Sequence, residues 1–252
     1  MTITTTPIDG VRPIDRTYAK VLAATENRRV LELLRSLEDG EWARPTDCPG
    51  WDVRALSGHV LGGMEGFTSA RQLVHTMRAG RKAAGDGPMI NGITAAQVQE
   101  RAGLSRAEVL DRMAEAGPKA ARWRNRVPAP LRRAPMKEEV GGVAETWRMG
   151  YLLDVILTRD TWMHRVDIAR ATGRALVLTP DHDGRLVADV VAEWARRHGK
   201  PFHLELTGAA GGTFTHGTGG EQRSLDAVDF CRTLSGRDDD GVTGLLATEV
   251  PF

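Results

Sequence analysis

The sequence has little of what several protein classes require. Its 252 residues include two cysteines, Cys48 and Cys231, which are too few for a cysteine zinc cluster or a disulfide framework. We expect two thiols in a reducing compartment rather than a disulfide. Aromatic residues make up 5% of the chain and the formal net charge is +1. No overall field therefore favours nucleic acid or a membrane surface.

Long hydrophobic runs are missing as well. Residues 1–7 are polar and lack the apolar centre of a signal peptide, and no run is long enough to span a bilayer. We therefore expect a soluble, cytoplasmic protein that binds neither nucleic acid nor membrane. Its oligomeric state is left open between a monomer and a homodimer. The basic residues are mainly arginine, with abundant alanine and glycine, a bias typical of GC-rich genomes such as those of actinobacteria.

Helical periodicity is present over the first two thirds of the chain. Apolar residues three and four apart predict helices at 14–37, 53–74, 105–126 and 143–172. Asp52 is a suitable N-cap for the second helix, Ser105 and Glu108 form a capping-box pattern before the third, and Gly173 can end the fourth. The proline-rich segment 127–142 is expected to be an ordered loop or lid. Four helices with one or two long connections predict a bundle.

The pattern changes after Gly173. Residues 186–197 predict one more amphipathic helix, and residues 202–207 alternate at period two, as a half-buried strand does. Residues 211–215 are the predicted hairpin partner, and Ser224 is the predicted cap of a helix that ends at Leu234. We therefore predict an α+β fold with a four-helix bundle at 1–174 and a small α/β domain at 175–252.

An Asp-x-x-x-His pair interrupts the apolar face of the last bundle helix. Helical spacing places six residues on that face: Leu153, Leu157, Asp160, His164, Asp167 and Ala171. A buried carboxylate or imidazole costs several kcal/mol unless it has a partner. Asp160 and His164 are about one turn apart and can reach the same ion. His59 lies on the core-facing side of the second predicted helix and is expected to point into the bundle.

We therefore predict a divalent metal site made of His59, Asp160 and His164. Three protein ligands leave a coordination position open, as in catalytic zinc sites, and that position can bind and deprotonate water or a thiol. The opposing interpretation is an ordinary ion pair on a helix beside hydrogen-bonded core histidines. Asp167 either orients His164 or pairs with an arginine such as Arg170, and a structural role is favoured.

Two other sequence features could indicate a catalytic or binding site but are not expected to form one. Cys48 lies beside the Pro49-Gly50-Trp51 turn and has no histidine near it in the sequence, so we expect a structural segment rather than a nucleophile. The glycine pairs at 62–63 and 211–212 lack the spacing of a phosphate-binding loop, so no nucleotide is implied.

Three stretches of sequence are similar to one known family. Residues 42–54 (WARPTDCPGWDVR) followed by His59, residues 159–168 (RDTWMHRVDI) and residues 230–237 (FCRTLSGR) resemble the mycothiol-dependent maleylpyruvate isomerases, which belong to the DinB-like group of metal-binding bundles. The resemblance implies an N-terminal four-helix bundle and a C-terminal domain resembling sterol-carrier folds.

The same resemblance implies the site residues. The family holds a divalent metal, usually zinc, with a histidine after the Pro-Gly-Trp segment and a Glu-x-x-x-His pair on the last bundle helix. His59 and His164 match these positions. Asp160 stands where the family has glutamate, a departure that shortens the ligand by one methylene. Arg237 is the best match for an arginine that is important in the C-terminal domain of such enzymes.

The activity that the resemblance implies is that of a metal-dependent isomerase or S-transferase that uses mycothiol as thiol cosubstrate. The metal would activate the thiol as a metal thiolate for addition to a small-molecule electrophile. In an isomerase, rotation and elimination follow, whereas a transferase keeps the adduct. Arg237 would hold a substrate carboxylate or stabilise an enolate.

Two alternatives stay open. One is a non-catalytic small-molecule-binding or stress-response module, which the departure at Asp160 and the sterol-carrier resemblance motivate. The other is a metal-dependent hydrolase with an activated water, in which Asp167 could be the base only if its carboxylate faced the open coordination position.

Overall fold

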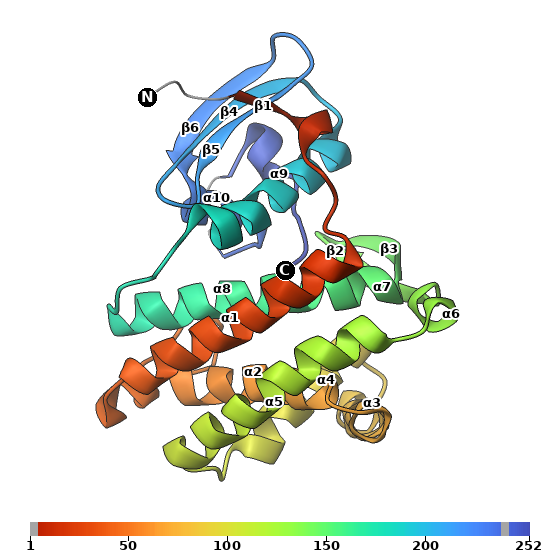
Figure 1. Ribbon diagram of the computed structural model, residues 1–252, viewed down its shortest axis with the longest axis vertical. Helices are drawn as coiled ribbons and strands as arrows, with labels where there is room; N and C mark the ends of the chain where they lie inside the picture. Colours follow the sequence, from red (N-terminus) through yellow and green to blue (C-terminus); the bar gives the residue numbers. More distant parts are fainter. Residues whose placement is uncertain (1–4, 238–241) are drawn as a thin grey trace. The chain divides into compact units, whose positions relative to one another are not determined.

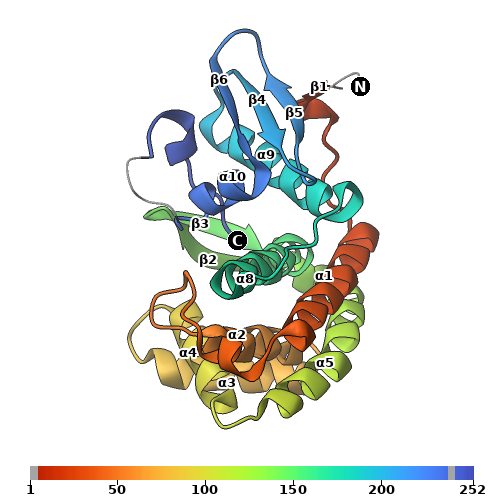
Figure 2. The same ribbon diagram turned by 90° about the vertical axis from the view of Figure 1, so that its left-hand side faces the viewer.

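A computed structural model describes residues 5–237 and 242–252 (Figures 1 and 2). The chain divides into two compact units. The helical unit comprises Arg16–Arg133 and Gly150–Leu176, and the sheet unit comprises Ala134–Met149, Val177–Phe252 and the described residues before Arg16. The domain boundary was predicted after residue 174, and the chain passes from the helical unit to the sheet unit after Leu176. The sheet unit also includes the described residues before Arg16 and the segment Ala134–Met149. The fold is α+β, as predicted.

Four helices of the helical unit form the bundle: α1 (Arg16–Ser36), α2 (Val53–Gly66), α5 (Arg106–Arg126) and α8 (Leu157–Thr172). Helices α1 and α2 each contact both α5 and α8. Helices α3 (Ala70–Ala84) and α4 (Met89–Arg101) pack as a pair beside α2 (Figure 2). The shorter elements are a 3-10 helix (Asp39–Ala43), α6 (Ala129–Arg132), α7 (Met149–Tyr151) and a π-helical turn (Leu152–Ile156). Among the described helices, none has the length and hydropathy needed to cross a bilayer.

Three helix start and stop signals in the helical unit lie where the sequence predicts them. The Asp52 carboxylate accepts a hydrogen bond from the backbone N–H of Ala55 at 2.8 Å, which caps α2. Ser105 and Glu108 form a reciprocal capping box at the start of α5. Gly173 ends α8 with a left-handed φ of 68°.

Two predicted helices are wrong in extent. The helix predicted at 53–74 ends at Gly66, and Ser69 caps the separate helix α3. The helix predicted at 143–172 begins only after residue 148, because Val143–Arg148 forms the strand β3 paired with β2 (Pro135–Val140). Glycines at 141 and 142 have φ of 56° and 74°, the conformation of a two-residue hairpin turn.

The segment expected to be a loop or lid, 127–142, therefore contains α6 and β2. Helix α4 was not predicted either. It packs on α3 so closely that a Cβ on Gly92 would lie 2.2 Å from the carbonyl oxygen of Gly80. Glycine spacing of this kind weakens the apolar periodicity from which helices are predicted.

Besides the β2–β3 hairpin, the sheet unit contains a four-stranded sheet in the order β1-β5-β4-β6. Its strands are β1 (Thr5–Pro7), β4 (Phe202–Thr207), β5 (Gly212–His216) and β6 (Glu221–Asp226). The predicted β4–β5 hairpin is confirmed as an antiparallel pair. Helix α9 (Arg185–His198) and helix α10 (Ala227–Leu234) pack against this sheet. The predicted Ser224 cap is wrong, since Ser224 lies in β6 and Asp226 caps α10.

The core of the helical unit is mainly apolar and also contains a fully buried ion pair between α8 and α1. Its apolar members come from all four bundle helices and include Val30, Leu34, Leu56, Val60, Met113 and Ile168. Nε of Arg165 on α8 lies 2.6 Å from Oε1 of Glu26 on α1, and both side chains are at most 2% exposed. A packing arrangement that separated the two side chains would leave a buried charge unpaired, so this pair favours one arrangement of α8 on α1.

Candidate metal centre

Helix α8 is buried on nearly all sides, which the sequence did not show. All residues from 161 to 169 are buried, although the pattern predicted one buried face. On the predicted face, the Asp167 side chain is 0% exposed and that of His164 is 9% exposed, whereas Asp160 is 31% exposed. The predicted ionisable groups thus run from the rim of the bundle at Asp160 into its interior.

The structure brings together the three predicted metal ligands. Oδ1 of Asp160 lies 3.3 Å from Nε2 of His164 and 3.6 Å from Nε2 of His59. Asp160 and His164 come from α8, and His59 comes from α2. All three donor atoms lie within 4.8 Å of one another. Two helices of one bundle therefore present three converging donor atoms.

This donor set fits a zinc-like cation. Zinc binds histidine nitrogen and carboxylate oxygen at about 2.0–2.2 Å, so neighbouring ligand atoms of a tetrahedral site lie about 3.4 Å apart. The separations of 3.3 and 3.6 Å at Asp160 match that spacing. The shorter aspartate therefore reaches both imidazoles, and the departure from glutamate does not separate the ligands.

Packing holds the ring of His59. Its Nδ1 atom is buried and has no hydrogen-bond partner within the described part of the chain. The Trp51 ring lies against it with a centroid separation of 5.3 Å, and the His164 ring lies edge-on at 5.0 Å. Two ring contacts thus take the place of the hydrogen bond that usually orients a metal-binding histidine.

The charges of the three groups depend on one another. Burial acts to raise the pKa of Asp160, but the adjacent His164 and His59 outweigh it and hold that pKa well below its usual value. Burial acts to lower the pKa of His164, but Asp160, Asp167 and Cys48 outweigh it and raise that pKa well above its usual value. Without a metal, the carboxylate of Asp160 is therefore neutralised by imidazolium.

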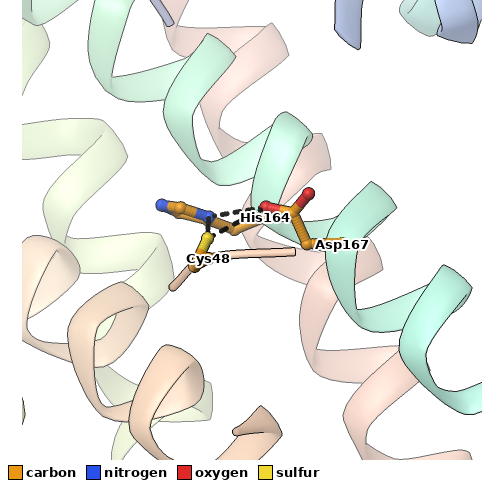
Figure 3. A group of neighbouring side chains, drawn as sticks. All are labelled: Cys48, His164 and Asp167. Carbon is orange, nitrogen blue, oxygen red and sulfur yellow. Dashed lines mark hydrogen bonds and ion pairs between the residues drawn. The ribbon is translucent and has the colours of Figure 1, made fainter. Parts of the chain in front are cut away.

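The other edge of the His164 ring contacts Asp167 and Cys48 (Figure 3). Oδ2 of Asp167 lies 3.1 Å from Nδ1 of His164, and Sγ of Cys48 lies 3.8 Å from the same nitrogen. The Cys48 thiol also donates to Oδ2 of Asp167 at 3.5 Å. Asp167 therefore orients His164 from the edge opposite Asp160, whereas Arg170 pairs with Asp47.

The position of Cys48 against His164 was missed by sequence reasoning. A tight turn places it there: the Trp51 N–H donates to the Cys48 carbonyl, and Gly50 has a φ of 79°, as in a Pro-Gly type II turn. The Arg44 guanidinium donates to the Thr172 carbonyl at 2.8 Å and anchors this segment to the end of α8. The available signal was a Pro-Gly turn directly before the helix that carries His59.

Arg237, the predicted catalytic arginine, lies in the sheet unit just after α10 and is half-buried. Its guanidinium donates to Oγ of Ser235 at 3.1 Å. Its role towards a substrate stays a prediction.

A cavity of about 720 Å³ lies elsewhere in the helical unit, lined by parts of α2, α3, α4 and α5. Its half-buried carboxylate, Glu65, lies 2.6 Å from Arg101 and 2.7 Å from Arg112. His59, Asp160 and His164 are not among its lining residues. Because the Glu65 carboxylate is already paired with two arginines, the three converging donor atoms outside this cavity are the better candidate for a functional site.

Comparison with known proteins settles the family. Residues 23–169, more than half of the chain and all three centre residues among them, match the family model described as the mycothiol maleylpyruvate isomerase N-terminal domain. The chain belongs to this family. The resemblance found in the sequence is thereby confirmed.

Two solved structures share the fold. They are crystal structures of the mycothiol-dependent maleylpyruvate isomerase and of a histidine-to-alanine variant of it. Each is 16% identical to this chain, with 98% of both chains covered and a TM-score of 0.57. No curated protein sequence matches this chain.

Proposed function

We propose that the protein is a mycothiol-dependent enzyme of the maleylpyruvate isomerase type, with a divalent metal, zinc being the expected one, held by His59, Asp160 and His164. The observation that carries this proposal is the convergence of three donor atoms on one point, 3.3 and 3.6 Å apart at Asp160. Membership of the family and the whole-chain likeness to a mycothiol-dependent maleylpyruvate isomerase support it.

A divalent cation in this centre supplies one chemical property: it lowers the pKa of a coordinated thiol and so provides thiolate at neutral pH. The protein groups prepare the ligands. Asp167 accepts a hydrogen bond from Nδ1–H of His164, so Nε2, which faces Asp160, is the nitrogen that would give up its proton and bind the cation. Trp51 fixes the ring of His59. With His59 and His164 neutral, Asp160 brings one negative charge to the cation.

The thiolate of mycothiol then adds to the activated double bond of a small electrophile. The carbon–carbon bond, now single, rotates, and elimination of the thiolate returns the other geometric isomer. If elimination does not follow, protonation leaves a thioether and the reaction is an S-transfer. Arg237 is proposed to hold a substrate carboxylate or to stabilise the enolate formed on addition.

The alternatives are weaker on the geometry. A metal-dependent hydrolase needs a base at the open coordination position, but Asp167 lies at the opposite edge of the His164 ring from Asp160. A non-catalytic binding module was motivated by the shorter ligand Asp160, which nevertheless reaches both imidazoles. Tight binding of an apolar molecule, with no thermal protection by mycothiol, would favour that module.

The test is a reconstitution of activity. Metal-free protein is loaded with zinc, and the isomerisation of maleylpyruvate is followed with and without mycothiol. We expect activity to need both additions. Asp160→Asn keeps the size of the ligand but loses its charge, and should reduce activity at least about a hundredfold. Asp47→Asn, on the exposed partner of Arg170, is the matched control and should stay near wild type.

Isomerisation by the metal-free protein, or full activity of Asp160→Asn, would contradict the proposal. Mass analysis of the product distinguishes the two reactions, since an S-transferase product retains the mass of mycothiol.

A further inference from the structure

Arg124 on α5 is a buried cation without a bonded partner. Its residue exposure is 5%, and its Nε atom is enclosed and unpaired. Within the described part of the chain, its guanidinium makes no hydrogen bond or close ion pair. Burying an unpaired guanidinium is costly, and proteins that retain such a group commonly use it.

The electrostatic neighbours of Arg124 point to the metal centre. Burial lowers its pKa to about 10, and the carboxylates of Asp154 and Asp160 oppose that shift. Arg124 therefore stays charged at neutral pH. Its two carboxylate neighbours are the π-turn residue Asp154 and the proposed metal ligand Asp160.

Both carboxylates already interact with other charged or metal-binding side chains. Asp154 forms a close ion pair with Arg132, and both side chains are largely buried. Asp160 faces His59 and His164, and its charge would be taken up by the cation in the loaded centre. With Asp154 paired to Arg132 and Asp160 paired to the cation, Arg124 then has no counter-ion of its own.

We propose that Arg124 is the anion-binding residue of the metal centre and receives a carboxylate of the small-molecule partner. The inference rests on the proposed metal site. A guanidinium suits this task because its planar fork matches two carboxylate oxygens. Nε is its only nitrogen both enclosed and unpaired, so the terminal nitrogens remain accessible to a ligand. Arg124 belongs to the helical unit, whereas Arg237 belongs to the sheet unit.

The test uses two thiols that differ only in charge. Full-length protein is loaded with cobalt(II) and titrated with 3-mercaptopropionate and with 3-mercaptopropionamide, and the thiolate-to-cobalt absorption reports binding. The wild-type protein should bind the acid at least about tenfold more tightly than the amide, the worth of a hydrogen bond to a charged group. Arg124→Met should lose this preference, and Arg124→Lys should retain part of it.

Arg122→Met is the matched control, since Arg122 lies on the same helix and is exposed. It should keep the wild-type preference for the acid. Arg124→Met should also bind cobalt at least as tightly as the wild-type protein, because a repelling charge has been removed. A merely structural arginine would instead weaken both the fold and the metal site when replaced.

An unchanged preference for the acid in Arg124→Met would overturn the inference, as would equal binding of acid and amide by the wild-type protein. If Arg124→Met does not fold, the test uses Arg124→Lys instead. A preference for the acid as large as that of the wild-type protein in this variant would overturn the inference. In each of these outcomes cobalt(II) still binds, so the role of Arg124 fails while the proposed metal site does not. Absence of cobalt binding, or of thiolate absorption with either probe, contradicts the proposed function itself and the role of Arg124 with it.

Discussion

His164 uses its two ring nitrogens for different tasks. Nε2 faces Asp160 and, beyond it, His59, while Nδ1 faces Asp167 and Cys48. A neutral imidazole carries one proton, so a hydrogen bond from Nδ1 to Asp167 leaves Nε2 free to bind a cation. Because the Asp167 side chain is 0% exposed, water does not compete for that bond. The orientation of His164 is thus set inside the bundle by the Asp167 carboxylate.

Asp167→Asn should weaken zinc binding about 10- to 100-fold, because the amide cannot stabilise the Nδ1–H of His164 as a carboxylate does. Competition with a chromophoric chelator measures the affinity. Cys48→Ser is the comparison, because serine can still donate to Asp167, and its effect should stay below about threefold. Wild-type affinity in Asp167→Asn would contradict this role for the carboxylate.

Among the site residues, contacts along one helix could be predicted from the sequence, whereas the contact made by a residue in a turn could not. Asp160, His164 and Asp167 follow from helical spacing alone, and His59 follows from its place on an apolar stripe. Cys48 contacts His164 from 116 residues away. That contact depends on the Pro-Gly turn and on the anchor from Arg44 to the end of α8, and periodicity reports neither.

At the scale of elements, the segment before α2 is anchored to the C-terminal end of α8. Glu41 in the 3-10 helix accepts a hydrogen bond from Arg174 at 2.6 Å, and Arg44 donates to the Thr172 carbonyl. A guanidinium on the last carbonyls of a helix also interacts favourably with its dipole. These contacts anchor the segment whose turn carries Cys48 against His164 and Trp51 against His59.

The Glu41 anchor should make stability depend on pH at the acid end. The hydrogen bond from Arg174, with that from the Glu38 backbone, lowers the pKa of Glu41 from 4.5 to about 2. A lowered pKa means that the stabilisation is complete above pH 4.5 and is lost as the pH falls towards 2. Glu41→Gln should therefore have a lower thermal midpoint than wild type at pH 6, with the gap closing near pH 2. A gap that is constant over this range, measured by circular dichroism, would contradict the assignment.

Element boundaries show why periodicity has limits. The apolar stripe of α2 continues in phase past Gly66, yet the chain turns there and Ser69 starts α3. Trp147 and Val143 read as helical positions but lie in a hairpin, because paired glycines at positive φ permit the turn. The π-helical turn before α8 shifts the register of that helix, which no 3.6-residue pattern predicts.

At the scale of the whole molecule, the two units are built from interleaved segments. Strand β1 pairs with β5 in parallel, with Thr5 opposite Thr213. This pairing joins segments that are far apart in the sequence, and such a contact leaves no local sequence pattern. A single domain boundary in the sequence therefore cannot describe it. The overall α+β class and the bundle are predictable, since both rest on the period and length of local runs.

Metal binding should stabilise the helical unit. A ligand that binds only the folded state at a hundred times its dissociation constant adds about 2.7 kcal/mol, or about 5–10 °C in the thermal midpoint of a unit of this size. Calorimetry of zinc-loaded and chelator-treated protein measures the shift. His164→Ala should show none, and a wild-type shift in that variant would place the stabilising ion elsewhere.

The most direct test of the account is the metal content of protein purified without added metal. Elemental analysis should find about one divalent ion per chain in the wild type and less than about a tenth of that in His164→Ala. His75→Ala, which removes an exposed histidine paired with Glu100, is the control and should keep the wild-type content. Full metal occupancy in His164→Ala, or a wild-type protein that takes up no zinc when it is offered, would contradict the central claim.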